Sequence, residues 1–188
     1  MESEGSITEL LAAWRDGEPD ALDALMPFVV DELERIARAR LRREHASDAL
    51  EPLALVNEAY IRLAGERSAS FTSRAHFLGA AAEAMRRILI DHARRRAAAK
   101  RSALLVTFDD LEVVDPGRPR PLDLIALDDA LRRLESLAPR QGKVVELRFY
   151  GGLSSTEVAE VLGVSERTVR RDWTTARAWL YRELTVAA

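Results

Sequence analysis

From Ile7 to Leu184, apolar residues return every three or four positions along most of the chain, which is the spacing of one face of an α-helix. Alternating runs rich in Val, Ile and Tyr, which build sheets, are missing, and aromatic residues make up only 6% of the sequence. Ala, Leu, Arg and Glu dominate instead, and these residues favour helices. The sequence therefore predicts an all-α fold.

The helical spacing stops between residues 102 and 121, where Pro and Gly cluster beside acidic residues. Because Pro and Gly interrupt helices, this stretch is expected to be a flexible linker. It divides the 188 residues into two small helical domains, 1–101 and 122–188. Each domain is long enough to bury a modest core of its own.

Separate apolar stripes predict the individual helices of both domains. In the first domain the expected helices are Ile7–Trp14, Asp20–Arg43, Leu53–Leu63 and Arg74–Arg96. Pro27 is expected to kink or split the second of these. In the second domain a helix is expected to begin near Leu122 and the next at Pro139, before the final motif described below.

Several classes of protein are excluded by what the sequence lacks. There is no cysteine, which excludes disulfides, thiol catalysis and cysteine-based zinc sites. No apolar run approaches the ~20 residues of a bilayer span, and the first ten residues do not form a signal peptide, so we expect a cytoplasmic protein. The three His residues lie far apart in the sequence, and no phosphate-binding glycine loop or nucleophile motif occurs. We therefore expect no enzymatic activity, no metal and no cofactor.

Charge is distributed unevenly, although the net charge is only -3. Between Arg86 and Arg101 there are seven basic residues and one acidic residue, whereas Met1–Glu34 carries ten acidic residues and one Arg. Residues 109–135 are again acidic, by eight to four. A basic helix attracts nucleic acid, and the acidic segments can compete for it until a partner rearranges the chain. A solvated arginine face is the alternative interpretation of the basic stretch.

The segment Leu153–Leu184 has the pattern of a helix-turn-helix. Ser154 and Glu157 have the spacing of a capping box, Gly163 can make the turn, and Ser165 can cap the second helix. On that second helix, Val169, Trp173, Ala176 and Leu180 fall on one face, and the arginines fall on the other. A helix of this kind fits the major groove, where Arg pairs with guanine edges or phosphates. The candidate DNA-contacting residues are Ser165, Arg167, Thr168, Arg170, Arg171 and Thr174.

The order of these motifs resembles that of the extracytoplasmic-function (ECF) sigma factors of bacterial RNA polymerase, over about Ala21–Leu184. LEPLALVNEAYIRL (Leu50–Leu63) is similar to the family's segment that docks on the clamp helices of the largest polymerase subunit. RAHFLGAAAEAMRRILIDHARRRAAAKR (Arg74–Arg101) is similar to the segment that engages the −10 promoter element. The helix-turn-helix, with the preceding LRRLESLAPRQGKVVELRFYGGLS, resembles the region that reads the −35 element.

The resemblance implies site residues beyond those of the helix-turn-helix. Those expected at the −10 region are Arg67, Ser68, Ser70, Arg74, Arg86, Arg87, Arg94, Arg95, Arg96, Lys100 and Arg101. In the family, the loop before the basic helix captures an extruded base; here that loop is Gly65–Ser73, where Phe71 offers a stacking face if it is not buried. Those expected to dock on the polymerase are Leu55, Val56, Asn57, Glu58, Ile61 and Arg62. Ala54 stands where many members carry an acidic residue, so docking is expected to depend more on Glu58, Asn57 and Arg62.

The partners that the resemblance implies are the polymerase core, through its clamp helices and flap region, and promoter DNA. An anti-sigma factor or another regulator is an open alternative. Two other functions compete with that of a sigma factor. A free-standing helix-turn-helix regulator would explain the C-terminal half alone, and a nucleic-acid-processing enzyme would need clustered carboxylates or metal ligands that the sequence lacks.

Overall fold

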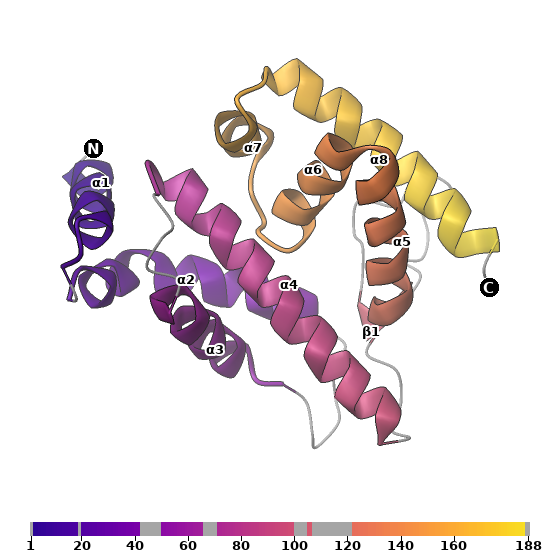
Figure 1. The fold of residues 1–188 in the computed structure, drawn as a ribbon, viewed down its shortest axis with the longest axis horizontal. Coiled ribbons are helices and arrows are strands. Elements are labelled where there is room, and N and C mark those ends of the chain that lie inside the picture. The colour runs from indigo at the N-terminus through magenta and orange to yellow at the C-terminus, as the bar shows by residue number, and fades with distance from the viewer. Residues whose placement is uncertain are drawn as a thin grey trace.

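The computed structural model describes residues 2–18, 20–41, 50–65, 71–99, 105–106 and 122–186. These residues form eight helices and two strands of two residues each, which confirms the all-α class (Figure 1). The helices are α1 (Glu2–Arg15), α2 (Ala21–Leu41), α3 (Pro52–Gly65), α4 (Arg74–Ala98), α5 (Leu124–Leu137), α6 (Pro139–Phe149), α7 (Ser155–Leu162) and α8 (Glu166–Val186). The strands are β1 (Leu105–Val106) and β2 (Leu122–Asp123).

Local signals in the sequence set several helix boundaries. The side chains of Ser73 and Asp123 each accept a hydrogen bond from a backbone N–H in the first turns of α4 and α5. Pro139 begins α6, as predicted, because its fixed φ suits a first helical turn. Pro27 lies inside α2, which runs without a break from Ala21 to Leu41, so the split that the sequence allowed does not occur.

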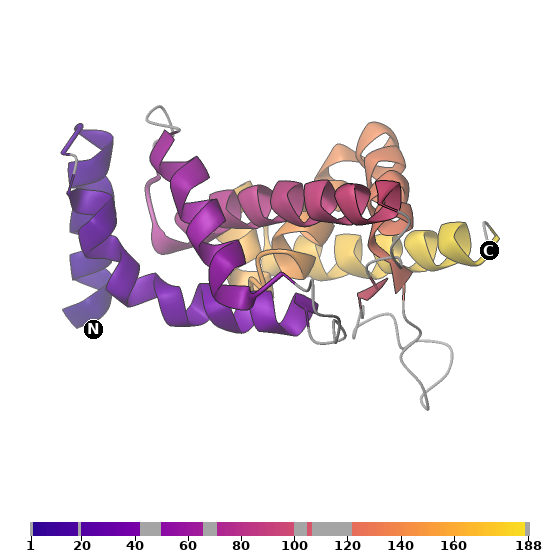
Figure 2. The same ribbon diagram turned by 90° about the horizontal axis from the view of Figure 1, so that it is seen from below.

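The longest helix, α4, lies between the other helices (Figure 1). On one side α4 packs against α3, which in turn packs against α2. On the other side it packs against α5, α6 and α7, and α8 covers all three of these from outside. Helix α1 stands at a steep angle to α2 at one end of the molecule, where it also contacts α4 (Figure 2).

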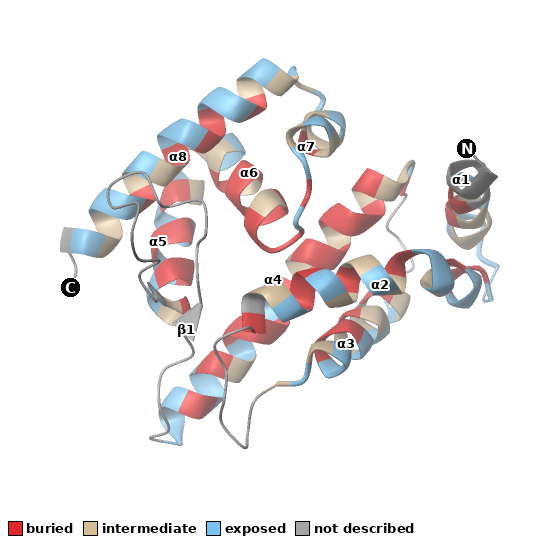
Figure 3. Cartoon of the chain, turned by 180° about the vertical axis from the view of Figure 1, so that it is seen from behind, coloured by how far each residue is buried: buried red, intermediate tan, exposed pale blue. Residues whose placement is uncertain are grey.

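The hydrophobic core runs through α4 from one half of the chain to the other. Buried residues occur on several sides of this helix and include Phe77, Met85 and Ile88 (Figure 3). They belong to a single cluster that also contains Leu25 of α2 and Leu131 of α5. The two halves therefore do not have separate cores in this arrangement, and the predicted division at 102–121 remains a prediction.

The ends of the predicted linker lie close together. β1 and β2 pair antiparallel, with Leu105 opposite Asp123 and Val106 opposite Leu122. The rest of the linker, 102–104 and 107–121, lies outside the described residues. The pairing holds Val106, inside the predicted linker, beside Leu122, which directly follows it.

Candidate nucleic-acid interface

Helices α7 and α8 form the predicted helix-turn-helix. At the start of α7, the Ser154 hydroxyl accepts a hydrogen bond from the Glu157 N–H at 3.2 Å, and the Ser154 N–H donates to the Glu157 carboxylate at 2.8 Å. This reciprocal pair confirms the capping box. Gly163 ends α7 at φ 62°, in the left-handed conformation that glycine adopts without strain. The Ser165 hydroxyl accepts a hydrogen bond from the Thr168 N–H at 3.2 Å and so caps α8.

One face of α8 is packed and the opposite face is exposed, as the sequence predicts. The packed residues are Val169, Trp173, Ala176 and Leu180, which lie against α5, α6 and α7. The exposed residues are Ser165, Arg167, Arg170, Arg171 and Thr174, while Thr168 is half-buried. The geometry thus brings three guanidinium groups together on one exposed helix surface, which we call the recognition face.

Some polar groups of the recognition face are already engaged within α8. Arg170 donates to the Glu166 carboxylate at 2.8 Å, and this hydrogen bond lowers the pKa of Glu166 below its ordinary value. The hydroxyls of Ser165 and Thr168 lie 2.9 Å apart at the helix cap. An exposed ion pair contributes little to stability, so Arg170 can exchange Glu166 for a DNA group at small cost.

Two contacts that the sequence analysis missed fix α8 to α6. Arg140 donates from Nε to the carboxylate of the buried Asp172 at 2.5 Å, and this hydrogen bond raises the pKa of Arg140. The guanidinium of Arg148 lies 4.4 Å from the centroid of the Trp173 ring. A carboxylate between the apolar residues Val169 and Trp173 was the available signal, because an acidic residue on a packed face needs a partner.

The basic residues of α4 are divided between surface and interior. Arg87, Arg94 and Arg95 are exposed, whereas Arg86 and Arg96 are buried. Arg74, at the start of the helix, is half-buried and pairs with Glu32 of α2 and, at 3.1 Å, with Glu157 of α7. The remaining predicted −10 residues, Arg67, Ser68, Ser70, Lys100 and Arg101, lie outside the described residues.

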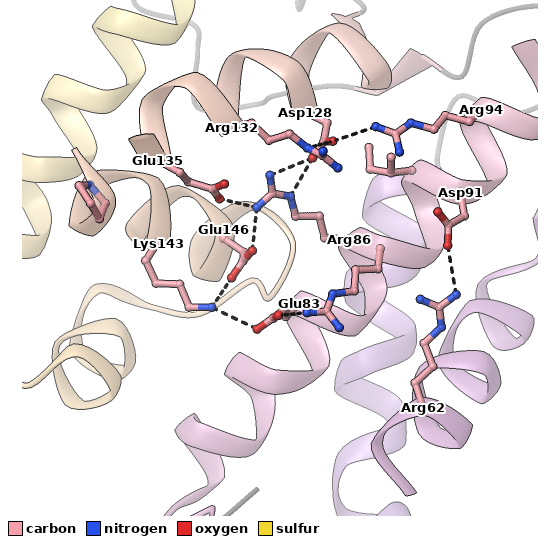
Figure 4. Close-up of a pocket in the computed structure, with 13 residues that line it drawn as sticks. Arg62, Glu83, Arg86, Asp91, Arg94, Asp128, Arg132, Glu135, Lys143 and Glu146 are labelled. Atoms are coloured by element: carbon pink, nitrogen blue, oxygen red, sulfur yellow. Dashed lines mark hydrogen bonds and ion pairs between the residues drawn. The ribbon is translucent and has the colours of Figure 1, made fainter. Parts of the chain in front are cut away.

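Arg86 differs from the exposed basic residues of α4 that were expected at the −10 region, because its side chain points into the molecule and not onto an exposed surface. Its residue exposure is only 8%, and it faces α5 and α6 (Figure 4). It lies 2.9 Å from Asp128, 2.5 Å from Glu135 and 2.8 Å from Glu146. Burial alone would lower the pKa of Arg86, but its hydrogen bonds to Glu135 and Glu146 outweigh burial and raise it.

The Arg86 cluster lines a surface groove of about 680 Å³ between α4 and helices α5 and α6. The carboxylate of Asp128 also forms ion pairs with the guanidinium groups of Arg132, at 2.9 Å, and Arg94, at 3.8 Å. Lys143 lies 3.5 Å from Glu83 of α4 and pairs with Glu146 on its own helix (Figure 4). Acidic and basic side chains thus alternate along the groove and neutralise one another.

The predicted docking residues of α3 are also divided between the interior and the surface. Leu55 and Val56 are fully buried, which leaves them no exposed surface to offer a partner. Asn57 is exposed and Ile61 is 67% exposed. Glu58 and Arg62 are half-buried and lie 3.2 Å apart.

Phe71, which the sequence analysis offered as a stacking face, is buried. Its ring stacks on Trp14 of α1 with a centroid distance of 5.1 Å, and it meets Phe77 of α4 edge to face at 5.8 Å. Phe71 therefore fixes α1 against the start of α4, and a base would have to displace Trp14 to stack on it.

Within the described ranges, no three His, Asp or Glu side chains come together as a metal site. Across the same residues, no helix combines the length and the apolar character needed to cross a bilayer.

Comparison with known proteins gives the family. None of the curated proteins compared with this chain matches it. The family model for ECF sigma factors matches residues 4–186, which is nearly the whole chain. Members of the family are non-catalytic subunits that act with the RNA polymerase core on promoter DNA. The chain therefore belongs to the ECF sigma factor family, and it acts with the RNA polymerase core in promoter-specific initiation of transcription.

Proposed function

We propose that the recognition face of α8 reads the −35 duplex, with Arg167, Arg170 and Arg171 as the residues that carry it. The observation that supports this most strongly is the combination of a capped helix-turn-helix, a packed face on α8 and three exposed guanidiniums opposite. Arginine forms bidentate hydrogen bonds with the O6 and N7 atoms of guanine, and this is the commonest specific contact between a side chain and a base. Thr174 adds an exposed hydroxyl to the same face.

The exposed cations of α4 hold the −10 region in this proposal. Arg87, Arg94 and Arg95 neutralise phosphates of the opening duplex, with Lys100 and Arg101 following them in the chain. No base-reading group lies beside Arg94 and Arg95 in the sequence, so phosphate contact suits them best. Each phosphate contact releases a counterion and so makes binding depend on salt.

The exposed side of α3 docks on the clamp helices of the largest polymerase subunit. Leu53 and Ile61 are 50% and 67% exposed, and Asn57 lies between them at helical spacing. Large apolar side chains aligned on an exposed helix face are typical of a protein–protein contact. Leu55 and Val56 support this face from the core, and Glu58 and Arg62 lie at its edge.

A second polymerase contact is proposed at the C-terminal half of the chain. Leu137, at the end of α5, is 70% exposed, the highest value among the large apolar side chains of the described residues. An apolar side chain so exposed fits a contact with the flap region of the polymerase. The cytoplasm, where the polymerase works, is the proposed compartment.

The test is reconstitution with the polymerase core on a library of promoter templates. We expect transcripts that depend on the chain and that share two sequence elements separated by a constant spacing. Transcripts without a shared upstream element would remove α8 from the reading of the −35 duplex. A matched pair of variants tests whether the recognition face selects the promoter sequence. Arg170→Ala changes that face, and Arg182→Ala changes the same helix nearer its end.

A further inference from the structure

We propose that the packing of α4 against α5, α6 and α7, which we call the seam, is an autoinhibitory contact held closed by a latch of ion pairs around Arg86. The second part of the proposal rests on the proposed function: the chain opens along the seam when it occupies a promoter.

The charges of the latch come from both halves of the chain. Arg86 of α4 reaches Asp128 of α5 at 2.9 Å and Glu146 of α6 at 2.8 Å. Asp128 and Glu146 are only 1% and 4% exposed, so three charged groups are buried together (Figure 4). Buried charges are tolerated only when they are paired. Arg86 therefore needs the carboxylates of α5 and α6 as long as the seam excludes water, and these carboxylates need Arg86. Opening the seam returns all of them to water.

The latch also occupies one cation that the proposed function assigns to DNA, Arg94, and one that the sequence analysis expected at the −10 region, Arg86. Arg86 pairs with carboxylates of α5 and α6, and Arg94 lies 3.8 Å from Asp128. In this arrangement carboxylates face two guanidiniums that would otherwise be available to phosphates. The closed chain therefore offers the −10 region fewer cations than its sequence contains.

Small residues let the two halves approach closely at the seam. A Cβ on Gly79 of α4 would lie 3.1 Å from the Leu147 side chain of α6. A Cβ on Gly151, after α6, would lie only 2.8 Å from Ala82 of α4, and one on Gly152 only 2.9 Å from Ile36 of α2. This packing is as close as that of a protein interior, so the seam is a specific interface that forms in one register.

The linker adds no reach while the seam is closed, because β1 near its start pairs with β2 directly after it. A compact chain of this length has a radius of gyration of about 16 Å. The names of the promoter elements imply a separation of roughly 25 base pairs, or about 85 Å. One closed chain therefore cannot place α4 and α8 on both elements. Twenty linker residues span up to about 70 Å when extended, and the widths of the two separated halves supply the rest of the distance.

The first experiment measures the distance between the halves in the full chain. Because the sequence has no cysteine, Asp31→Cys in α2 and Arg182→Cys in α8 create two exposed sites for a pair of dyes. We expect one short distance in the parent chain and longer distances when Asp128→Asn and Glu146→Gln neutralise the latch. The control pair, Asp129→Asn and Glu160→Gln, makes the same change in charge at exposed positions and should leave the distance short.

The same variants predict DNA binding by the chain without polymerase. The latch variant is expected to bind a duplex carrying both promoter elements more tightly than the control pair, by about 5- to 150-fold, the usual range for coupling between two states. A duplex with the −35 element alone should bind both variants equally, because the recognition face is exposed in the closed chain. Long distances in the parent chain, or a short distance retained in a latch variant of native helicity, would overturn the latch.

The second experiment locks the seam and does not depend on the folding of the latch variant. A Cβ on Gly79 would lie 3.7 Å from Cγ1 of Val161 in α7, so Gly79→Cys with Val161→Cys should form a disulfide across the seam. We expect the oxidised chain to give no transcripts with the polymerase core and the reduced chain to give them. Failure of the disulfide to form, or transcription by the locked chain, refutes the proposal. If the reduced chain and the parent chain are both inactive, the proposed function fails, while the distance measurement still decides the latch.

Discussion

Arg74, the first residue of α4, donates a hydrogen bond to the carboxylate of Glu157, 3.1 Å away in the first turn of α7. The same carboxylate accepts hydrogen bonds from the N–H and the hydroxyl of Ser154, at 2.8 and 2.7 Å. Burial alone would raise the pKa of Glu157, but the bonds from Ser154 and the charge of Arg74 outweigh it. The pKa of Glu157 therefore lies below its ordinary value of 4.5.

The lowered pKa predicts how Glu157 contributes to stability at different pH. A carboxyl group whose pKa is lower in the folded chain contributes stability that is fully present above the unfolded value and is lost as the pH falls through the folded value. We expect Glu157→Gln to lower the free energy of unfolding near neutral pH, and the difference to shrink as the pH falls below 4.5. Urea unfolding at a series of pH values measures this. Glu160→Gln, an exposed position on the same helix, is the control and should show no such convergence.

Gly163 predicts a backbone effect that is free of packing. Its φ is 62°, and a Cβ added there would meet nothing within 4 Å. Gly163→Ala should therefore lower the free energy of unfolding by about 1 kcal/mol through the strained left-handed conformation alone. Gly65→Ala is the matched control, because a Cβ there also meets nothing within 4 Å and its φ is not positive. Equal effects of the two substitutions in thermal unfolding would contradict this account of the turn.

Arg170 is expected to select promoter sequences. Loss of a bidentate contact with a base costs about 1–3 kcal/mol and relaxes the preference at that position. Arg170→Ala should therefore change which −35 sequences the holoenzyme transcribes from a randomised promoter library. If all promoters are reduced by the same factor, Arg170 contacts phosphate and the recognition face does not read bases through it.

Arg94 is expected to act on all promoters alike. It is exposed and lies in the basic run of α4, so we assign it to a phosphate. Arg94→Ala should weaken promoter binding without changing sequence preference and should reduce the slope of log affinity against log salt by about 0.9. Transcription from the same library at two salt concentrations measures both quantities. A changed sequence preference would show that Arg94 reads bases.

Ile61 is expected to contribute to the docking surface on α3. Ile61→Glu should weaken binding to the polymerase core by about tenfold, or ~1.4 kcal/mol, because it places a charge in an apolar contact. Its exposure predicts unchanged helicity in circular dichroism. Ala126→Glu, at an exposed position of α5, places the same charge elsewhere and should leave the affinity for the polymerase core intact.

Leu55, on the same helix, is expected to contribute to stability. Leu55→Ala should lower the free energy of unfolding by about 2–5 kcal/mol, because it leaves a cavity in the hydrophobic core.

Local features of the fold could be predicted because a few neighbouring residues determine them. The capping box of Ser154 and Glu157, the turn at Gly163 and the start of α6 at Pro139 each depend on fewer than five consecutive residues. The packed stripe of α8 follows from helical spacing, which holds wherever a helix forms.

The seam could not be predicted, because helical spacing says which residues share a face but not what covers that face. Arg86 and Arg87 are both polar positions of α4, yet Arg86 is buried against carboxylates of α5 and α6, whereas Arg87 is exposed and pairs with Glu83 of its own helix. The same reasoning applies to α3, where Leu55 and Ile61 are both apolar and only Leu55 is buried. Distinguishing such residues requires the contacts between segments far apart in the chain.

The close fit around Gly79 has a consequence for exchanging parts between related proteins. A chimera that joins residues 1–101 of this chain to the C-terminal half of another family member would place foreign side chains against Gly79 and Arg86. It would close only if the new half supplied carboxylates at the places of Asp128 and Glu146 and glycines at those of Gly151 and Gly152. A mismatched half would instead give a chain that is permanently open, so promoter specificity could be transplanted only at the loss of control over when it is used.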